Sequence, residues 1–302
     1  MPPCLRWVGG PNGSLSSALM SEPRPIQVPS TDGVTVIAHD HGGIGPVVLL
    51  SHATGFHGRY WDPIVARLPQ GYRYVAIDLR GHGDSIVPDG VSMNWRGMGE
   101  DVLAVVDALD AGSVRAVGHS MGGCAVIRAE LERPGTIEAA WLCEPIIFPN
   151  DAGPARTTEG DSRMAETARK RREVFDSFDA VLERYGSRPP FSAVHPDALR
   201  AYVLHGFREQ DDGSVILKCR RDTEAAVFEH AQTDTFDHLA SVTAPVTVAG
   251  SGDGDGPATF APGVADALPL GTFEYYGDLT HFAPLEDPDR IAAAIAAALG
   301  LD

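Results

Sequence analysis

The segment from Val114 to Gly122 constrains the fold of this chain more than any other. It begins with a short, mainly apolar run and ends in the pattern Gly-x-Ser-x-Gly, with Ser120 at the centre. The residues that follow, Cys124 to Leu131, have helical character. A short apolar run bounded by a turn is typical of a buried strand. The sequence therefore predicts a strand that turns sharply into a helix, with a serine at the bend.

A turn as tight as this one holds the serine backbone in a strained conformation. Gly118 and Gly122 lack the Cβ atoms that would collide with the strand and the helix. The Ser120 hydroxyl would then stand exposed at the carboxyl end of the strand, a geometry known as a nucleophile elbow. Because the chain has 33 glycines in 302 residues, the pattern could arise by chance, so its meaning depends on its surroundings.

Four further apolar runs predict strands that are buried on both faces, as the strands of a parallel sheet are. These runs cover residues 46–51, 74–77, 139–143 and 245–250. Segments with helical spacing separate the early runs, at residues 59–68 and 98–109. Such alternation implies βαβ crossovers, so the sequence predicts an α/β fold with a mainly parallel, doubly wound sheet.

Both ends of the predicted fold carry turn and cap signals. Near the start, an Asp-Gly pair separates two short strands and predicts a hairpin at the edge of the sheet. Near the end we expect a final helix, preceded by a helix near 262–268 and a strand at 272–275. Asp287 is placed to cap the final helix, Pro288 to start it and Gly300 to end it.

The alternation stops between about residues 148 and 239, where polar helices follow one another without buried strands. We interpret this region as an inserted helical cap. The predicted domains are a flexible extension at 1–24, a core at 25–147 and 240–302, and the cap at 148–239. One helical face of the cap is expected to pack partly on the core and partly around an apolar pocket above Ser120; it comprises Val174, Phe175, Phe178, Val181, Leu182 and Tyr185.

Composition limits the partners of the chain. The formal net charge of −17 argues against nucleic acid or an anionic membrane, because both would repel such a surface. No apolar run reaches the roughly 18 residues of a membrane span, and residues 1–20 lack the apolar segment of a signal peptide. Cys4, Cys124, Cys143 and Cys219 show no metal spacing. We therefore expect a soluble, cytoplasmic protein with reduced thiols and no metal site.

A serine hydroxyl becomes a good nucleophile only when a base accepts its proton and an acid holds that base. His281 follows the last predicted strand, where a loop can lean over Ser120. Asp253 follows the preceding strand and completes the chain order serine, aspartate, histidine. The sequence therefore favours Ser120, His281 and Asp253 as catalytic residues. Asp255, and Glu144 at the end of the strand after the elbow, stay open as alternative acids.

The oxyanion of a tetrahedral intermediate needs two backbone N–H donors. Met121 would supply one at the start of the elbow helix. We expect the second from Thr54, in the loop after the first buried strand, with Gly55 or Phe56 as alternatives. These amides would form an oxyanion hole beside Ser120.

Other polar residues receive a structural interpretation. His52 and His82 are interpreted as residues that hold loops in place. The basic run from Arg169 to Arg172, which includes Lys170 and Arg171, is interpreted as a solvated helix face rather than as a site that attracts an anionic substrate.

Taken together, these motifs resemble those of the α/β-hydrolase superfamily. The resemblance is carried by Asp78-Leu79-Arg80-Gly81-His82-Gly83-Asp84-Ser85, by Gly118-His119-Ser120-Met121-Gly122, by Gly250 to Asp253, and by His281-Phe282 with Glu286-Asp287-Pro288. It covers about residues 26–299 except the cap and implies the α/β-hydrolase fold. The segment 52–56 departs from it, because many members have His-Gly followed directly by the oxyanion residue. That departure leaves the second oxyanion donor open.

The resemblance also implies an activity. Related dehalogenases and epoxide hydrolases carry an aspartate at the elbow, so Ser120 argues against both. The expected function is a serine hydrolase that cleaves an ester, thioester or lactone of a small, largely apolar substrate through an acyl-enzyme, without a cofactor. Alternatives are C–C bond hydrolysis or perhydrolysis on the same triad, and a ligand receptor of the same fold that barely turns over. The cap sets the substrate, and the sequence does not indicate an oligomeric state.

Overall fold

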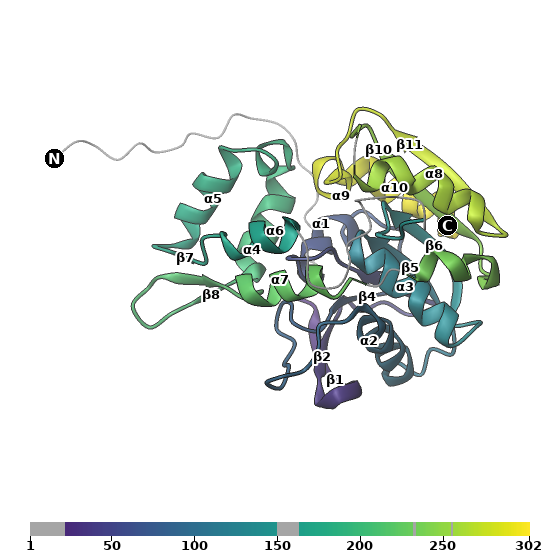
Figure 1. The fold of residues 1–302 in the computed structure, drawn as a ribbon, viewed down its shortest axis with the longest axis horizontal. Coiled ribbons are helices and arrows are strands. Elements are labelled where there is room, and N and C mark those ends of the chain that lie inside the picture. The colour runs from purple at the N-terminus through teal and green to yellow at the C-terminus, as the bar shows by residue number, and fades with distance from the viewer. Residues whose placement is uncertain (1–21, 150–162, 232–233, 255) are drawn as a thin grey trace.

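The computed structural model describes residues 22–149, 163–231, 234–254 and 256–302. Within these ranges the chain forms two sheets with helices around them. Figure 1 shows the larger sheet and its helices to the right, with the inserted elements α4 to α7 to the left. Residues 1–21, most of the predicted extension, lie outside the described ranges, and β1 begins at Arg24.

The larger sheet has eight strands in the order β1-β2-β4-β3-β5-β6-β10-β11. Their bounds are β1 Arg24–Pro29, β2 Thr35–Asp40, β3 Val47–Ser51, β4 Arg73–Asp78, β5 Val114–His119, β6 Ile137–Cys143, β10 Val246–Ser251 and β11 Gly271–Tyr276. The strands from β4 to β11 pair in parallel, whereas β1 pairs antiparallel with β2 and β2 antiparallel with β4. The predicted sheet and its edge hairpin, which turns at Thr31–Gly33, are confirmed.

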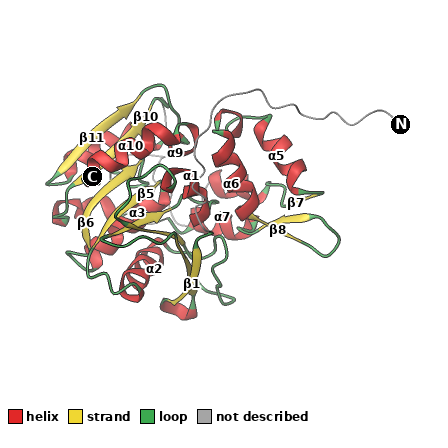
Figure 2. Cartoon of the chain, turned by 180° about the vertical axis from the view of Figure 1, so that it is seen from behind, coloured by secondary structure: helices red, strands yellow, loops and turns green. Residues whose placement is uncertain are grey.

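Helices cover both faces of this sheet (Figure 2). Their bounds are α1 Asp62–Val65, α2 Trp95–Ala108, α3 Met121–Glu132, α8 Pro257–Ala267, α9 Ala283–Glu286 and α10 Pro288–Leu299. Helices α2, α3 and α8 bury their apolar residues in one core cluster, while α1 and α10 bury theirs in a second. The spacing of the apolar residues explains why one face of α10 is buried. Ile291, Ile295 and Leu299 lie four residues apart and form one buried stripe.

The final helix begins and ends as predicted. The Asp287 side chain accepts a hydrogen bond from the Arg290 N–H at 3.0 Å, and Pro288 is the first helical residue. Gly300 follows the helix with a left-handed φ of 58°. These local signals therefore suffice to define α10.

The predicted helix at 59–68 is shorter than expected. A 3₁₀ segment, Gly58–Trp61, precedes the single turn of α1. Beyond α1, the N–H groups of Arg67 and Leu68 donate to carbonyls three residues back. This tighter pattern does not extend an α-helix, so the helical segment ends early.

The insertion contains helices and a small sheet. Its helices are α4 Arg163–Arg169, α5 Phe178–Gly186, α6 Pro196–Gly206 and α7 Arg221–Glu229, with 3₁₀ segments at Phe191–Ala193 and Thr235–Ser241. Its sheet has the order β7-β9-β8, with β7 Val174–Phe175, β8 Phe207–Glu209 and β9 Val215–Leu217. The expectation of a cap without buried strands is therefore wrong, because β9 is buried and pairs on both sides.

The predicted apolar helix face divides between two elements. Val174 and Phe175 lie in β7, and α5 begins only at Phe178, where Ser177 caps the helix by accepting a backbone hydrogen bond at 3.2 Å. A short apolar run fits a strand as well as a helix, and pairing with β9 decides between them here. Phe175 is buried inside the insertion, with its ring 5.7 Å from that of Phe207.

Three of the four cysteines are buried free thiols, as predicted: Cys124, Cys143 and Cys219. Cys4 lies outside the described residues. Cys124 and Cys143 lie in α3 and β6, and both belong to the apolar clusters of the core. Both therefore act as small apolar residues of the core.

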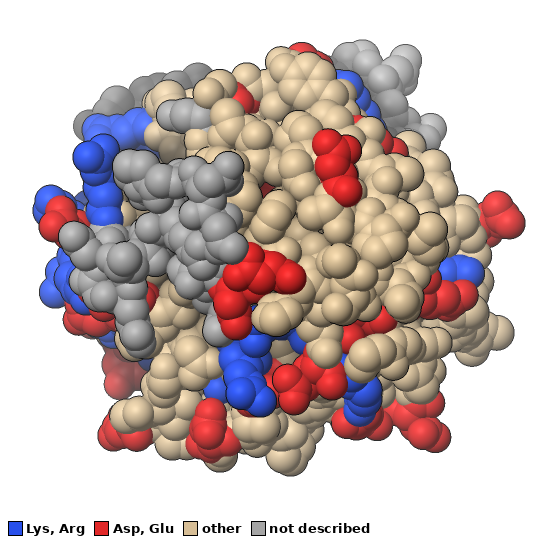
Figure 3. Space-filling view, turned by 45° about the vertical axis from the view of Figure 1, so that its right-hand side comes forward, with Lys and Arg blue, Asp and Glu red and all other residues tan. Residues whose placement is uncertain are grey.

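Acidic and basic side chains intermingle on the surface. In Figure 3 they lie mainly along the margins of the face shown, around a broad area of uncharged residues. Some of them pair, as Arg67 does with Asp289 and Arg133 with Asp107. On this face the negative net charge thus forms no single acidic field. No helix in the described ranges is long and apolar enough to cross a membrane.

Candidate active site

The predicted nucleophile elbow lies between β5 and α3. Ser120 has a φ of 56° and a ψ of −119°, values that a non-glycine residue adopts only under strain. Its N–H donates to the Cys143 carbonyl at 2.9 Å, and its carbonyl accepts from the Ile146 N–H at 3.1 Å. These two hydrogen bonds tie the elbow to β6 and to the segment that follows β6, so the strained backbone is held from both sides.

Two glycines make the elbow sterically possible. A Cβ atom on Gly122 would lie 2.4 Å from the Ser51 carbonyl oxygen, and one on Gly118 would lie 2.6 Å from the Gly123 Cα. Both distances are far below van der Waals contact, so alanine at either position would displace the backbone. The close approach of β3, β5 and α3 therefore requires glycine here.

His281 is held at three atoms next to the elbow. Its N–H donates to Asp253 Oδ2 at 2.7 Å, its carbonyl accepts from His119 Nε2 at 2.8 Å, and its ring Nδ1 bonds to Glu144 Oε2 at 2.5 Å. The rings of His119 and His281 lie 4.9 Å apart. Because His119 directly precedes Ser120, these contacts bring His281 beside the elbow, with the ring Nε2 not engaged by Glu144.

Asp253 does not hold the histidine ring, and the expectation that it does is wrong. Its carboxylate binds the main chain of His281, whereas Glu144, one of the two alternatives, binds the ring. Asp255, the other alternative, lies outside the described residues. The structure therefore brings together Ser120, Glu144 and His281, with Asp253 supporting the loop.

The order of strands explains this outcome. β6 lies between β5 and β10, and in the register of the sheet Cys143 pairs with His119 on one side and with Ala249 on the other. Glu144, the residue after β6, therefore adjoins both the elbow and the end of β10. Asp253 lies two residues beyond the end of β10, where it meets the loop backbone after β11.

Glu144 is fully buried and bonded at both carboxylate oxygens. Oε1 accepts from the Ser251 N–H at 2.7 Å, and Oε2 faces the His281 ring. Burial by itself raises the pKa of Glu144, but the hydrogen bonds from His281 and Ser251 outweigh it and hold the pKa below its usual range. The carboxylate is therefore ionised at neutral pH and can offset a positive charge on His281.

Thr54 and Met121, the two predicted oxyanion donors, lie against each other. The Thr54 hydroxyl donates to Met121 Sδ at 3.3 Å, which brings the loop after β3 to the start of α3. Met121 is the first residue of α3, so its N–H has no partner within the helix. The backbone contacts of the described residues include none from the Thr54 N–H. Neither amide has a backbone partner among the described residues, as an oxyanion donor requires.

One of the two alternative donors is engaged elsewhere. The Phe56 N–H donates to the Ala53 carbonyl at 3.1 Å and closes a turn. Burial raises the pKa of the Cys219 thiol, and the nearby Gly55 backbone lowers that pKa without offsetting the burial. Thr54 and Gly55 are thus the candidates whose N–H groups have no backbone partner in the part of the chain that the structure describes, and Thr54 is the one that lies against Met121.

His52 and His82 connect loops, as predicted. The ring of His52 bonds to the Ala53 carbonyl at 2.8 Å through Nδ1 and accepts from the Leu79 N–H at 3.0 Å through Nε2. His82 Nδ1 bonds to the Arg80 carbonyl at 3.0 Å. Burial lowers the pKa of His82 to about 4, so its ring is neutral at pH 7.

An aromatic cluster lies between the insertion and the core beside His281. We use this term for Phe56, Phe191 and Phe282, whose ring centroids lie 5.5, 5.9 and 6.2 Å apart in pairs. Phe191 and Phe282 are only half-buried, so part of each ring is open to a ligand. Phe191 could not be predicted from the sequence, because it follows two prolines and belongs to no periodic run.

The basic run at the end of α4 is not uniformly solvated. Arg169 and Arg172 are exposed, as predicted, but Arg171 is directed inward. Its Nη1 donates to Glu224 Oε2 at 2.6 Å, and its Nη2 donates to the Tyr202 hydroxyl at 2.9 Å. Nothing in the sequence distinguishes Arg171 from its basic neighbours, because the packing of α6 and α7 creates its surroundings.

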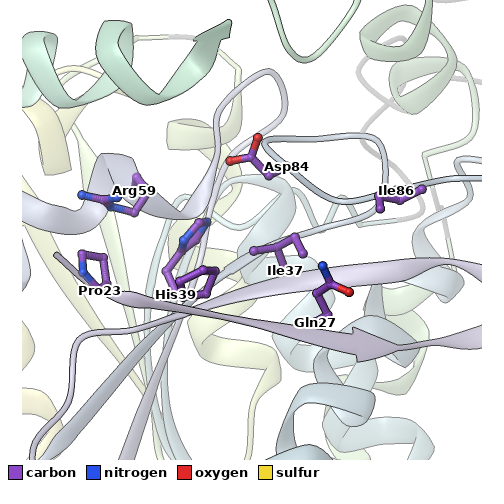
Figure 4. A pocket seen from close by; sticks show the side chains of 8 residues that line it. Pro23, Gln27, Ile37, His39, Arg59, Asp84 and Ile86 are labelled. Carbon is purple, nitrogen blue, oxygen red and sulfur yellow. The ribbon is translucent and has the colours of Figure 1, made fainter.

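A separate pocket lies at the edge of the larger sheet, away from the elbow. Its walls, shown in Figure 4, are formed by Pro23, Pro25, Gln27, Ile37, His39, Arg59, Asp84 and Ile86. Ser120, Glu144 and His281 contribute nothing to these walls. Within the described ranges, no group of three or more His, Cys, Asp or Glu side chains is arranged to hold a metal ion.

Buried neutral histidines are expected to make the fold sensitive to acid. Burial lowers the pKa of His41, His82 and His205 to about 4 and that of His57 to about 3, from an ordinary value of 6.5. The unfolded chain takes up these protons near pH 6.5, and the folded chain does not. Stability is therefore complete above about pH 6.5 and falls toward pH 4, by up to about 1.4 kcal/mol per pH unit for each histidine.

Urea unfolding at pH 7, 6 and 5 measures this loss as a fall in the free energy of unfolding. His205→Gln is the matched variant, because it removes one half-buried histidine ring of the four. The free energy of unfolding of this variant should fall less between pH 7 and pH 5, by the contribution of one histidine. A free energy of unfolding that stays constant from pH 7 to pH 5 would contradict the prediction.

Comparisons with known proteins add to this description. The model of the alpha/beta hydrolase family matches residues 47–294. The 3-oxoadipate enol-lactonase 1 of Acinetobacter baylyi is 26% identical over 280 residues, which cover 90% of this chain and 95% of that protein. A non-heme chloroperoxidase of Streptomyces lividans is 29% identical over 270 residues, which cover 84% and 92% of the two chains.

A solved structure supports the same fold. The crystal structure of E-2-(acetamidomethylene)succinate hydrolase superposes with a TM-score of 0.73 at 19% identity, over 92% of this chain and 99% of that one. The family match includes the elbow, the end of β6 and the loop after β11, so it spans every element that carries the candidate site. Its extent, together with the sheet order and the elbow, shows that the chain belongs to the alpha/beta hydrolase family.

Proposed function

We propose that the protein is a serine hydrolase that cleaves an ester, thioester or lactone of a small, largely apolar substrate. The observation that carries this proposal is the hydrogen bond from His281 Nδ1 to the buried Glu144 carboxylate, made beside the strained Ser120. A carboxylate on one ring nitrogen orients the other nitrogen for proton transfer. The relative named as an enol-lactonase supports a lactone or ester as the bond that is cleaved.

In the first half of the reaction, Ser120 Oγ attacks the carbonyl carbon while His281 Nε2 takes the hydroxyl proton. The carbonyl oxygen becomes an oxyanion that accepts hydrogen bonds from the Met121 and Thr54 N–H groups. Glu144 offsets the charge of the protonated ring. The bond to the leaving group then breaks, His281 returns its proton to the leaving alcohol or thiol, and the acyl group stays on Ser120.

In the second half, water attacks the acyl carbon and His281 takes one of its protons. The same two amides stabilise the second oxyanion. When that intermediate collapses, Ser120 Oγ regains a proton from His281 and the carboxylic acid leaves. Water is the only second substrate that this cycle consumes.

Rapid-mixing kinetics test the proposal. p-Nitrophenyl butyrate should be turned over many times per enzyme, and mass spectrometry of an acid-quenched sample should find a butyryl group on the peptide that contains Ser120. A ligand receptor of the same fold would take up the label once and release no further product. Single labelling without sustained turnover would therefore overturn the proposal in favour of that alternative.

Perhydrolysis is the second candidate, and the relative named as a chloroperoxidase is the observation that favours it. Here hydrogen peroxide replaces water in the second half of the reaction, so the acyl group leaves Ser120 as a peracid. The test mixes the protein with acetate, peroxide and bromide and follows bromination of monochlorodimedone. Bromination that requires Ser120 would support this activity, whereas a rate equal to that of the protein-free mixture would exclude it.

The aromatic cluster is expected to set the preference for acyl-chain length. Phe191→Ala should lower kcat/KM for p-nitrophenyl octanoate by about tenfold and that for the acetate by less than about twofold. A ring that covers about 50 Å² of a long acyl chain contributes roughly 1.3 kcal/mol, and acetate is too short to reach it. The measurement is kcat/KM for the acetate, butyrate and octanoate esters.

Phe175→Ala is the matched control for this prediction. The Phe175 ring is buried inside the insertion and has no ring contact with the three residues of the cluster, from which the Tyr185 ring separates it. Its loss should lower thermal stability and leave the ratio of octanoate to acetate unchanged. If the parent shows no dependence on chain length, or if Phe191→Ala keeps the parent's ratio, the cluster does not contact the acyl chain.

A further inference from the structure

The loop that carries Thr54 is held from the insertion. The Gly55 carbonyl accepts a hydrogen bond from the Tyr202 hydroxyl of α6 at 3.3 Å. Further along the loop, His57 Nε2 donates to the Tyr202 carbonyl at 3.0 Å. Both contacts are buried and connect core residues to Tyr202 of the insertion. The backbone on the C-terminal side of Thr54 is therefore anchored to α6.

An ion pair lies directly against this loop. Gly55 has a φ of 79°, and a Cβ atom there would lie 2.6 Å from Glu224 Oε1 and 3.0 Å from Arg171 Nη1. Arg171 Nη1 and Glu224 Oε2 are themselves 2.6 Å apart. Because Glu224 offsets the guanidinium charge, Arg171 is not a free cation that would attract a substrate carboxylate. Its position indicates a structural action on the loop.

Arg171 also directs the Tyr202 hydroxyl. Its Nη2 donates to that oxygen at 2.9 Å, so the hydroxyl accepts from Arg171 and directs its own hydrogen toward the Gly55 carbonyl. The contacts thus form a chain from guanidinium to hydroxyl to backbone carbonyl. A charged donor at one end strengthens the neighbouring hydrogen bond.

From these contacts we propose that the insertion positions the oxyanion site through Tyr202 and Arg171. The inference rests on the proposed function, in which the Thr54 N–H is the second oxyanion donor. The Ala53 turn fixes one side of that amide, and the anchored Gly55 fixes the other. Tyr202 and Arg171 do not reach the reacting atoms and are positioning residues. The oxyanion site is then complete only while the insertion is docked on the core.

Tyr202→Phe tests the proposal, because it removes the hydroxyl and keeps the buried ring. We expect kcat for p-nitrophenyl butyrate to fall about tenfold, a fraction of the effect of losing an oxyanion donor outright, with KM within about twofold of the parent value. Tyr185→Phe is the matched control. Its hydroxyl also lies near Arg171, at 3.4 Å, but has no contact with the loop, so kcat should stay within about twofold.

The inhibition constant of a tetrahedral inhibitor distinguishes a loss of oxyanion binding from general damage to the structure. Butylboronic acid adds to a serine hydroxyl and places a boronate oxygen where the oxyanion would lie. Its inhibition constant should rise in Tyr202→Phe by the same factor by which kcat/KM falls.

A double-mutant cycle tests the part played by Arg171. Arg171→Lys should add little to the loss of kcat caused by Tyr202→Phe, because both changes break the same series of hydrogen bonds.

The outcomes separate this inference from the proposed function. Equal losses in Tyr202→Phe and Tyr185→Phe would overturn it, as would an inhibition constant that Tyr202→Phe leaves unchanged. Additive losses in the cycle would remove Arg171 from the chain. If the parent shows no turnover that depends on Ser120, the proposed function itself fails and takes the inference with it. Turnover that depends on Ser120 but not on Tyr202 defeats the inference alone.

Discussion

Ser120→Ala is expected to lower kcat by about 10³-fold or more, because no other group at the elbow can form the acyl-enzyme. The fold should survive the change, since the hydrogen bonds that hold the elbow come from the Ser120 backbone and not from its hydroxyl. The measurement is kcat with p-nitrophenyl butyrate, with circular dichroism and thermal unfolding as checks on the fold. Turnover near the parent rate in a clean preparation would remove Ser120 from the mechanism.

Ser120→Gly is the informative companion variant. Alanine keeps the strained φ of 56°, whereas glycine adopts it freely. Both variants should be inactive, but Ser120→Gly should exceed Ser120→Ala in free energy of unfolding by about 1 kcal/mol. Equal stability would mean that the elbow stores no strain. A clear difference would show that the fold tolerates an unfavourable backbone in order to place the hydroxyl at the end of β5.

Glu144→Gln is expected to lower kcat by about 10²- to 10⁴-fold. The His281 ring would lose the ionised partner that holds its orientation and offsets its positive charge. The free energy of unfolding should fall as well. Both oxygens of Glu144 accept from donors, so the amide nitrogen of glutamine must face either the Ser251 N–H or the His281 ring, at a cost of about 1 to 3 kcal/mol.

Asp253→Asn is the matched control for that change. One acceptor oxygen is enough for the His281 N–H, and asparagine retains it, so we expect a loss of less than about tenfold. Steady-state kinetics of the two variants side by side decide between the carboxylates. If Asp253→Asn is the more damaging change, Asp253 serves as the acid during turnover and our assignment of Glu144 is wrong.

Local patterns in the sequence determined the fold class and two of the three central residues. Apolar runs indicate strands that are buried on both faces, and Gly-x-Ser-x-Gly indicates a turn that only glycines permit. The sheet and Ser120 could therefore be predicted from a few neighbouring residues. The caps of α10 are equally local, because Asp287 and Gly300 act within one turn of their own helix. His281 followed from its place after the last strand.

Short apolar segments in the insertion were ambiguous for a physical reason. Val174 and Phe175 fit a helix face or a strand, and only a partner strand distinguishes the two. That partner, β9, lies about 40 residues further along the chain and is itself three residues long. No pattern within either segment predicts that β7 pairs with β9.

Only the tertiary structure decided which groups meet at the site. Glu144 and His281 are 137 residues apart, and Gly55 and Tyr202 are 147 apart, so neither contact leaves a local signal. The chain order serine, aspartate, histidine favours Asp253 as the acid, but the sheet places the end of β6 between the elbow and β10. Spatial order in a doubly wound sheet differs from chain order, and the packing of the whole sheet selects the carboxylate that reaches the ring.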